Sequence, residues 1–183
     1  MSSRCEVSID KNIVTKIYKV EESFIQEKEA YQRLSRRKYI PELIELDEEN
    51  WILKIAKISA PTLAEYVNKK SKIPYNLAKD LKDILIDMAN EGIVDTPDFY
   101  KFGEHIFVEE DESIKIIDFD VNISFPKDDL NYDGVVNRRK QYIEKEYAFL
   151  DGEEESWNAF ERLLFCAGLT KDVIDDFYVN ILK

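Results

Sequence analysis

The sequence predicts an α+β protein with a small mixed lobe followed by a larger, mainly helical lobe. Within residues 1–58, apolar and polar residues alternate as they do in strands, and a single stretch has helical spacing. From residue 59 onward the apolar residues recur at helical intervals, interrupted by one hairpin pattern. Apolar residues make up 44% of the 183 residues, enough for a buried core. We therefore expect two compact lobes, at residues 1–58 and 59–183.

Four strands and one helix are expected in the first lobe. The segments CEVSID and IVTKIYK alternate in polarity around a turn at residues 10–12 and predict a hairpin. Ser23 and Gln26 then have the spacing of a capping box. The residues that follow at helical intervals are Phe24, Glu27, Tyr31 and Leu34. A second strand pair is expected at residues 43–46 and 51–58, joined by a polar turn.

Helical spacing dominates the second lobe. Thr62 and Glu65 form a second capping-box signal, which opens a short helix through Val67. A longer helix, ended by Gly92, has its apolar side formed by Leu77, Leu81, Ile84, Leu85 and Met88. Two short apolar runs within residues 106–117 predict another hairpin. Three further helices are expected at 130–149, 154–167 and 171–182.

The charge of the chain excludes some partners and leaves others open. With 26 Lys and Arg against 38 Asp and Glu, the net charge is −12, which argues against nucleic acids and anionic membranes as partners. The first forty residues are nevertheless basic, because they include the cluster Arg33, Arg36, Arg37 and Lys38. This cluster is typical of a helix C-terminus, whose dipole favours cations. The alternative is a docking patch for an acidic partner.

Glycine, cysteine and histidine placement excludes several kinds of site. The five glycines are too far apart for a P-loop or a G-x-G-x-x-G turn. Cys5 and Cys166 cannot form a disulfide framework, which favours a reducing, cytoplasmic setting. His105 is the single histidine, so a zinc site or a Ser-His-Asp triad is not expected. No apolar run has the length of a membrane span, and the first residues lack a signal-peptide pattern.

The segment IKIIDFD, residues 114–120, carries the most specific chemistry. A buried strand ends here at Asp118, and Phe119 is expected to anchor that carboxylate in the core. Carboxylate oxygens held in this way suit Mg²⁺, which prefers hard oxygen ligands. A solvated turn after a strand is the alternative interpretation of the same residues.

The residues before this segment add context. They read GIVDTPDFYKFGEHIFV, so a helix is followed by an acidic loop, a hairpin and Asp118. This order resembles the protein-kinase-like superfamily, and the DFY followed by a histidine resembles its lipopolysaccharide-core sugar kinase branch. The resemblance implies that Asp98 is the catalytic base, with Asp95 competing for that role. It also implies that Asp118 binds the metal and that His105 takes the position of a metal-ligating Asn.

The small lobe has matching residues. The strand VTKIYK resembles the V-A-I-K strand of kinases. The resemblance implies that Lys16 holds the α- and β-phosphates of ATP, that Val14 covers the adenine, and that Glu27 forms an ion pair with Lys16. Only fifteen residues precede Lys16, so we expect the first kinase strand and the glycine-rich loop to be missing or vestigial.

Three functions remain open from the sequence. The first is an ATP- and Mg²⁺-dependent phosphotransferase acting on a hydroxyl of a protein or small molecule, with Asp98, Lys16 and Glu27 as its catalytic residues. The second is a pseudokinase, in which the same fold serves as a protein-interaction module. The third is an α+β interaction protein unrelated to kinases. The sequence does not indicate a substrate.

Overall fold

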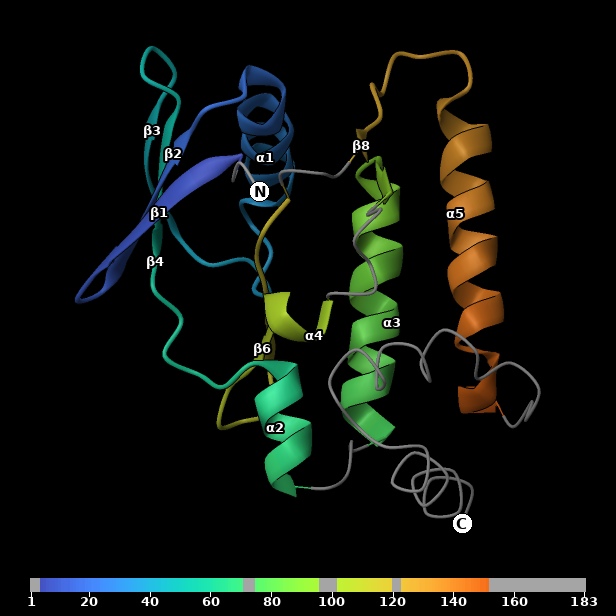
Figure 1. Ribbon diagram of the computed structural model, residues 1–183. Helices are drawn as coiled ribbons and strands as arrows, with labels where there is room; N and C mark the ends of the chain where they lie inside the picture. The colour runs from blue at the N-terminus through green and yellow to red at the C-terminus, as the bar shows by residue number, and fades with distance from the viewer. Residues whose placement is uncertain (1–3, 71–74, 96–101, 120–122, 152–183) are drawn as a thin grey trace.

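A small antiparallel sheet and one long helix form the first part of the chain in a computed structural model, which describes residues 4–70, 75–95, 102–119 and 123–151 (Figure 1). The sheet has four strands in the order β1-β2-β4-β3, and α1 lies beside it. The five elements are β1 (Cys5–Asp10), β2 (Ile13–Tyr18), α1 (Glu21–Leu34), β3 (Leu43–Asp47) and β4 (Ile52–Ala56).

Helices predominate in the rest of the described chain, and two short strand pairs accompany them. The helices are α2 (Leu63–Lys70), α3 (Tyr75–Asn90), α4 (Phe102–His105) and α5 (Tyr132–Glu146), followed by a 3₁₀ turn (Ala148–Asp151). Antiparallel pairs join β6 (Ile106–Val108) to β7 (Ile114–Ile116) and β5 (Ile93–Asp95) to β8 (Ile123–Ser124). The predicted α+β class is thus confirmed. The helices expected at 154–167 and 171–182 lie outside the described residues, and the division into lobes at residue 58 stays a prediction.

The face that α1 buries is the one that its sequence spacing predicts. Its buried residues are Ser23, Phe24, Glu27, Ala30, Tyr31 and Leu34. The expected capping box at Ser23 is wrong, because α1 begins at Glu21 and Val20 makes no side-chain capping bond. Ser23 is therefore a buried residue of the first turn. Glu21 and Glu22 favour this earlier start, since carboxylates at a helix N-terminus interact well with the helix dipole.

The capping box predicted at the start of α2 is present. The backbone N–H of Glu65 donates to Thr62 Oγ1 at 3.2 Å, and the backbone N–H of Thr62 donates to Glu65 Oε2 at 2.9 Å. Each side chain therefore satisfies a backbone donor that the helix itself leaves open. The helix extends to Lys70, past the Val67 end expected from the sequence.

Two arginines of the basic cluster join the end of α1 to α3. Arg37 Nε donates to Asp87 Oδ2 at 2.6 Å, and Arg37 Nη2 donates to Glu91 Oε1 at 2.8 Å. Arg33 Nη1 donates to the carbonyl of Phe125 at 2.8 Å. These contacts favour a structural role for both residues over a docking patch. None of the helices in the described ranges is long and apolar enough to cross a membrane.

Gly92 allows the chain to turn from α3 into β5. Its φ is +78°, and a Cβ at this position would lie 2.8 Å from the Phe125 carbonyl oxygen and 2.8 Å from the Tyr132 ring. Only glycine meets both requirements without a shift of the backbone. Gly134, at the start of α5, has no heavy atom within 4 Å of the same Cβ position.

We predict opposite effects from alanine at these two glycines. Gly92→Ala should lower the free energy of unfolding by at least about 1–2 kcal/mol, the cost of a left-handed non-glycine residue, with the clash added. Gly134→Ala should raise it by up to about 1 kcal/mol, because alanine is the better helix former. Urea unfolding of both variants measures the difference. Equal effects at the two positions would contradict the role given to Gly92.

Candidate functional site

A buried ion pair joins the sheet to α1. Lys16 lies in the middle of β2, and its side chain is only 5% exposed. Its Nζ donates to Glu27 Oε1 at 2.8 Å and to Oε2 at 2.9 Å. Tyr18, two residues along the same strand face, also donates its hydroxyl to Glu27 Oε2. The ion pair expected between Lys16 and Glu27 is therefore present, and Tyr18 is a member that the sequence analysis missed.

The same ammonium group also reaches Asp118. Lys16 Nζ donates to Asp118 Oδ1 at 2.8 Å, although the two residues are 102 positions apart in the chain. His105 Nε2 lies 3.2 Å from the other carboxylate oxygen, Oδ2. Glu27 and Asp118 thus meet around one buried cation, and His105 contacts Asp118. We call Lys16, Glu27, Asp118, His105 and Tyr18 the Lys16 network.

Asp118 is held in place from both sides. It follows β7 with a φ of +72°, a left-handed conformation that is uncommon outside glycine and is found preferentially at functional sites. The next residue, Phe119, is buried and packs edge-on against Tyr31 of α1, with ring centroids 5.7 Å apart. The expected anchoring role of Phe119 is confirmed. The Asp118 side chain itself is 29% exposed, so it contacts Lys16 on one side and remains accessible to solvent.

Burial and the neighbouring charges together shift the pKa values of the network. Burial alone lowers the pKa of Lys16, but the carboxylates of Glu27 and Asp118 raise it by more, so the net shift is upward from 10.5. Burial raises the pKa of Glu27, and Lys16 opposes that rise. Burial and the neighbouring Glu27 also raise the pKa of the Tyr18 hydroxyl. Lys16 is therefore an ammonium ion at neutral pH, and Tyr18 is a neutral donor.

An apolar strip continues from Lys16 across the sheet. Val14 is half-buried on the same strand face as Lys16. On β1, Val7 lies opposite Lys16 and Ile9 lies opposite Val14, and these two side chains are 56% and 62% exposed. Directly opposed residues of an antiparallel pair share a face, so Val7 and Ile9 extend the surface beside Lys16. The sequence analysis assigned neither residue to the site.

Not every predicted site residue can be placed. Asp98, the predicted catalytic base, lies outside the described residues. Its competitor Asp95 is the last residue of β5. The described part of the chain contains no group of three or more His, Cys, Asp or Glu side chains that could hold a metal ion. The metal-binding roles predicted for Asp118 and His105 therefore stay predictions.

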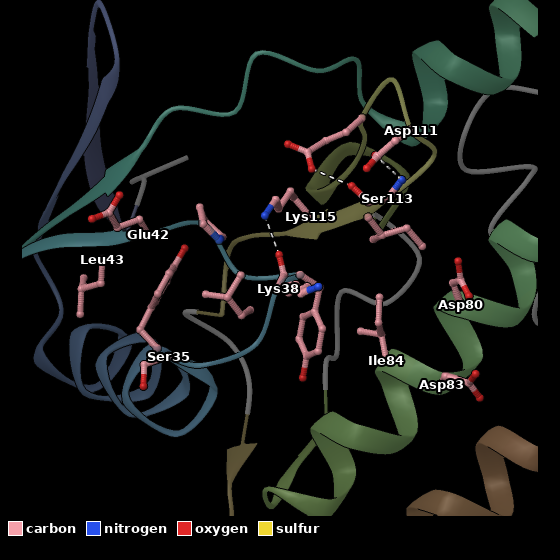
Figure 2. Close-up of a pocket in the computed structure, with 16 residues that line it drawn as sticks. Ser35, Lys38, Glu42, Leu43, Asp80, Asp83, Ile84, Asp111, Ser113 and Lys115 are labelled. Carbon is pink, nitrogen blue, oxygen red and sulfur yellow. Dashed lines mark hydrogen bonds between the residues drawn. The ribbon is translucent and has the colours of Figure 1, made fainter.

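A separate cavity of about 1020 Å³ lies between the segment after α1, the helix α3 and the β6–β7 hairpin. Figure 2 shows its lining, with Asp80 and Asp83 contributed by α3 and Lys115 reaching the Lys38 carbonyl from the hairpin. Lys16, Glu27 and Asp118 are absent from this lining. The chemistry of the Lys16 network therefore does not depend on this cavity.

Comparisons with known proteins connect the chain to kinase-like structures only distantly. No family model matches it, and no curated protein does. A crystal structure of WbdD matches with 15% identity and a TM-score of 0.48, over 90% of this chain and 42% of that one. A structure described as the bifunctional kinase-methyltransferase WbdD has 12% identity and a TM-score of 0.48, over 98% and 47%. The chain thus spans less than half the length of these WbdD chains.

A third solved structure is a choline/ethanolamine kinase family protein from Mesorhizobium loti. It matches with 12% identity and a TM-score of 0.45, over 100% of this chain and 90% of that one. The TM-scores of these matches lie below 0.5, so they carry no argument about activity.

We predict that removing the Lys16 charge destabilises the fold strongly. Lys16→Met leaves Glu27 buried without a counter-charge, which should cost about 3–5 kcal/mol of unfolding free energy. Lys54→Met, which removes a lysine from a surface pair with Glu45, should cost less than about 1 kcal/mol. Adding Glu27→Gln to Lys16→Met should recover part of the loss, because the amide carries no charge. Denaturant unfolding compares the variants.

The destabilisation should depend on pH. Burial raises the pKa of Glu27 above its ordinary value of 4.5, so the folded state binds the proton more tightly than the unfolded chain. Stability then falls as pH rises through the folded pKa. Lys16 opposes this rise in the wild type, so its removal raises the pKa of Glu27 further, and the deficit of Lys16→Met should be largest at neutral pH and shrink toward pH 4.5. A deficit independent of pH would show that the loss of packing, and not the buried charge, causes it.

Proposed function

We propose that the chain is a kinase-like phosphotransferase domain that binds ATP with Mg²⁺ at the Lys16 network. The observation that supports this most strongly is the single buried ammonium that contacts Glu27 of α1 and Asp118 after β7. Phosphoryl transfer requires mainly positioning and neutralisation of phosphate charge. A cation, a carboxylate that orients it and a second carboxylate for the metal are the groups that this chemistry uses.

Lys16 would bind the phosphates. Glu27 and Tyr18 fix one side of the network inside the protein, so Lys16 has little freedom to turn away. Its contact with Asp118 is the more exposed of its two ion pairs. We therefore expect phosphate oxygens to replace Asp118 at Lys16 Nζ, while the bonds to Glu27 remain. Lys16 keeps its charge during this exchange, because the two carboxylates hold its pKa above 10.5.

Asp118 would hold Mg²⁺. Its carboxylate supplies the hard oxygen ligands that this ion prefers, and it is accessible to solvent. Bound Mg²⁺ would neutralise charge on the phosphates. His105 was predicted as a second ligand, but imidazole nitrogen suits Mg²⁺ less well than oxygen. Its 3.2 Å contact with Asp118 Oδ2 supports positioning of the carboxylate as its contribution.

The apolar strip beside Lys16 would receive the nucleotide base. Val7, Ile9 and Val14 lie on one face of the sheet next to Lys16, and the first two are exposed. An aromatic base gains free energy by covering such side chains. Asp98 is proposed as the base that accepts the proton of the attacking hydroxyl. The substrate that carries this hydroxyl is not indicated.

One observation favours the second candidate, a nucleotide-binding pseudokinase. Residues 1–91 contain no glycine, so this stretch has no glycine-rich loop to cover the phosphates. Such a loop contributes to positioning the transferred phosphoryl group in kinases. Binding and turnover must therefore be measured separately.

Binding is tested by the melting temperature in the presence of ATP and Mg²⁺. A ligand at a hundred times its Kd stabilises the native state by about 2.7 kcal/mol. Asp118→Asn should remove most of the Mg²⁺-dependent part of the shift, since a neutral amide does not balance the cation. Asparagine tolerates a positive φ, so the backbone at +72° is not strained further. Asp128→Asn, at an exposed carboxylate, is the control and should leave the shift unchanged.

Turnover distinguishes the enzyme from the pseudokinase. Asp98→Asn should leave the ATP-dependent shift largely intact and abolish phosphotransfer or slow ATP hydrolysis. If wild type shows no shift at millimolar ATP and Mg²⁺, the nucleotide-binding proposal is wrong. If wild type binds ATP but Asp98→Asn changes no measurable turnover, the pseudokinase is the correct alternative.

A further inference from the structure

The strand β1 forms an open edge of the small sheet. Among the residues that the structure describes, its one strand partner is β2, and β2 in turn pairs with β4 (Figure 1). Two of its apolar side chains, Val7 and Ile9, are more than half exposed. An edge of this kind carries a row of backbone donors and acceptors that can pair with another strand.

The backbone hydrogen bonds between β1 and β2 show which residues face that edge. Lys19 N–H donates to the Arg4 carbonyl at 2.9 Å, which makes the opposed residues Arg4 and Lys19 a hydrogen-bonded pair. Hydrogen-bonded and non-hydrogen-bonded pairs alternate along an antiparallel ladder. The backbone groups of Glu6, Ser8 and Asp10 therefore face β2, and those of Val7 and Ile9 face the open edge.

We propose that two copies of this chain associate through this edge, with β1 antiparallel to β1 and Val7 opposite Val7 of the second copy. In this register Cys5 lies opposite Ile9, so apolar residues meet apolar residues on the face that carries Lys16. On the other face Arg4 lies opposite Asp10, once at each end of the pairing, and both residues are exposed. The result is a continuous sheet with four strands from each copy.

The neighbouring registers are disfavoured by like charges. Centring the pairing on Glu6 places this residue opposite itself, and centring it on Ser8 places Glu6 opposite Asp10. Like charges directly opposed across two strands are destabilising. Of these three registers, only the one centred on Val7 combines matched apolar residues with two opposite-charge pairs. It also places Arg4 and Asp10 at non-hydrogen-bonded positions, where opposed side chains lie closest.

The other edge of the sheet lacks this complementarity. On β3, centring on Glu45 places it opposite itself, and centring on Leu46 places Glu45 opposite Asp47. The β3–β4 ladder also has an irregularity between Leu43 and Glu45, which makes β3 a poorer template. We therefore assign self-association to β1. A pairing of six-residue strands is small, so the dimer should dissociate on dilution.

A charge swap tests the register. Arg4 and Asp10 lie on the face opposite Lys16, so changing them leaves the Lys16 network intact. Sedimentation velocity over a range of concentrations should show a monomer–dimer equilibrium for wild type. Arg4→Asp and Asp10→Arg should each shift it toward monomer by at least tenfold in Kd, and the double variant should restore it. Arg36→Asp, at an exposed arginine after α1, is the control and should match wild type.

A disulfide provides a second readout that does not depend on affinity. In a Cys5→Ser, Cys166→Ser background, Val7→Cys should form an intermolecular disulfide on mild oxidation, since opposed Cα atoms are about 5.5 Å apart in such pairs. Ile17→Cys, exposed on β2 away from the edge, should not crosslink. A wild type that stays monomeric, a double swap that does not restore dimerisation, or equal crosslinking at both positions overturns the proposal.

Discussion

The Lys16 ammonium is the group on which the arrangement of the rest depends. A buried cation is costly unless carboxylates surround it, and here one comes from α1 and another from the segment after β7. The contact with Glu27 fixes α1 against the sheet, and the contact with Asp118 fixes this residue beside Lys16. The far end of α1 is held as well, because Arg37 binds Asp87 and Glu91 of the α3 region. The helix is thus tied at its middle and at its end.

Stability alone does not account for this network. Buried ion pairs are often no more stabilising than apolar residues of the same size, although removing one partner is costly. Burial on this sheet needs no charge, as the buried apolar residues Leu53 and Ile55 on the neighbouring strand show. The left-handed backbone at Asp118 adds a further cost at the same place. These costs are concentrated around one partly exposed carboxylate, which supports the proposal that Asp118 contributes to a ligand site.

The sequence predicted local features well because they depend on neighbouring residues. Strand alternation, the spacing along α1 and the Thr62–Glu65 capping box follow from rules that act over a few positions. The start of α1 was misplaced because Ser23 and Gln26 match a capping spacing by chance. The pairing of Lys16 with Glu27 was anticipated from a resemblance to kinases and not from the residues alone.

Contacts between distant segments could not be predicted in the same way. The residues around Lys16 and Asp118 in the sequence do not indicate that these two side chains are in contact. The positive φ of Asp118 could not be predicted either, because this position is not a glycine. The contacts of Arg37 could not be predicted from the basic cluster, because its partners Asp87 and Glu91 lie about fifty residues later. Tyr18 could have been found, since strand alternation puts it on the face of Lys16.

The most direct test of the central claim follows the Lys16 ammonium itself while nucleotide is added. NMR of lysine side-chain amines in the wild-type protein, titrated with ATP and Mg²⁺, reports each ammonium group without any substitution. We expect the Lys16 signal to shift in a saturable manner as phosphate replaces Asp118, while Lys28 and Lys54, which bind surface carboxylates, remain unchanged. A Lys16 signal that stays in place at saturating nucleotide would contradict the account.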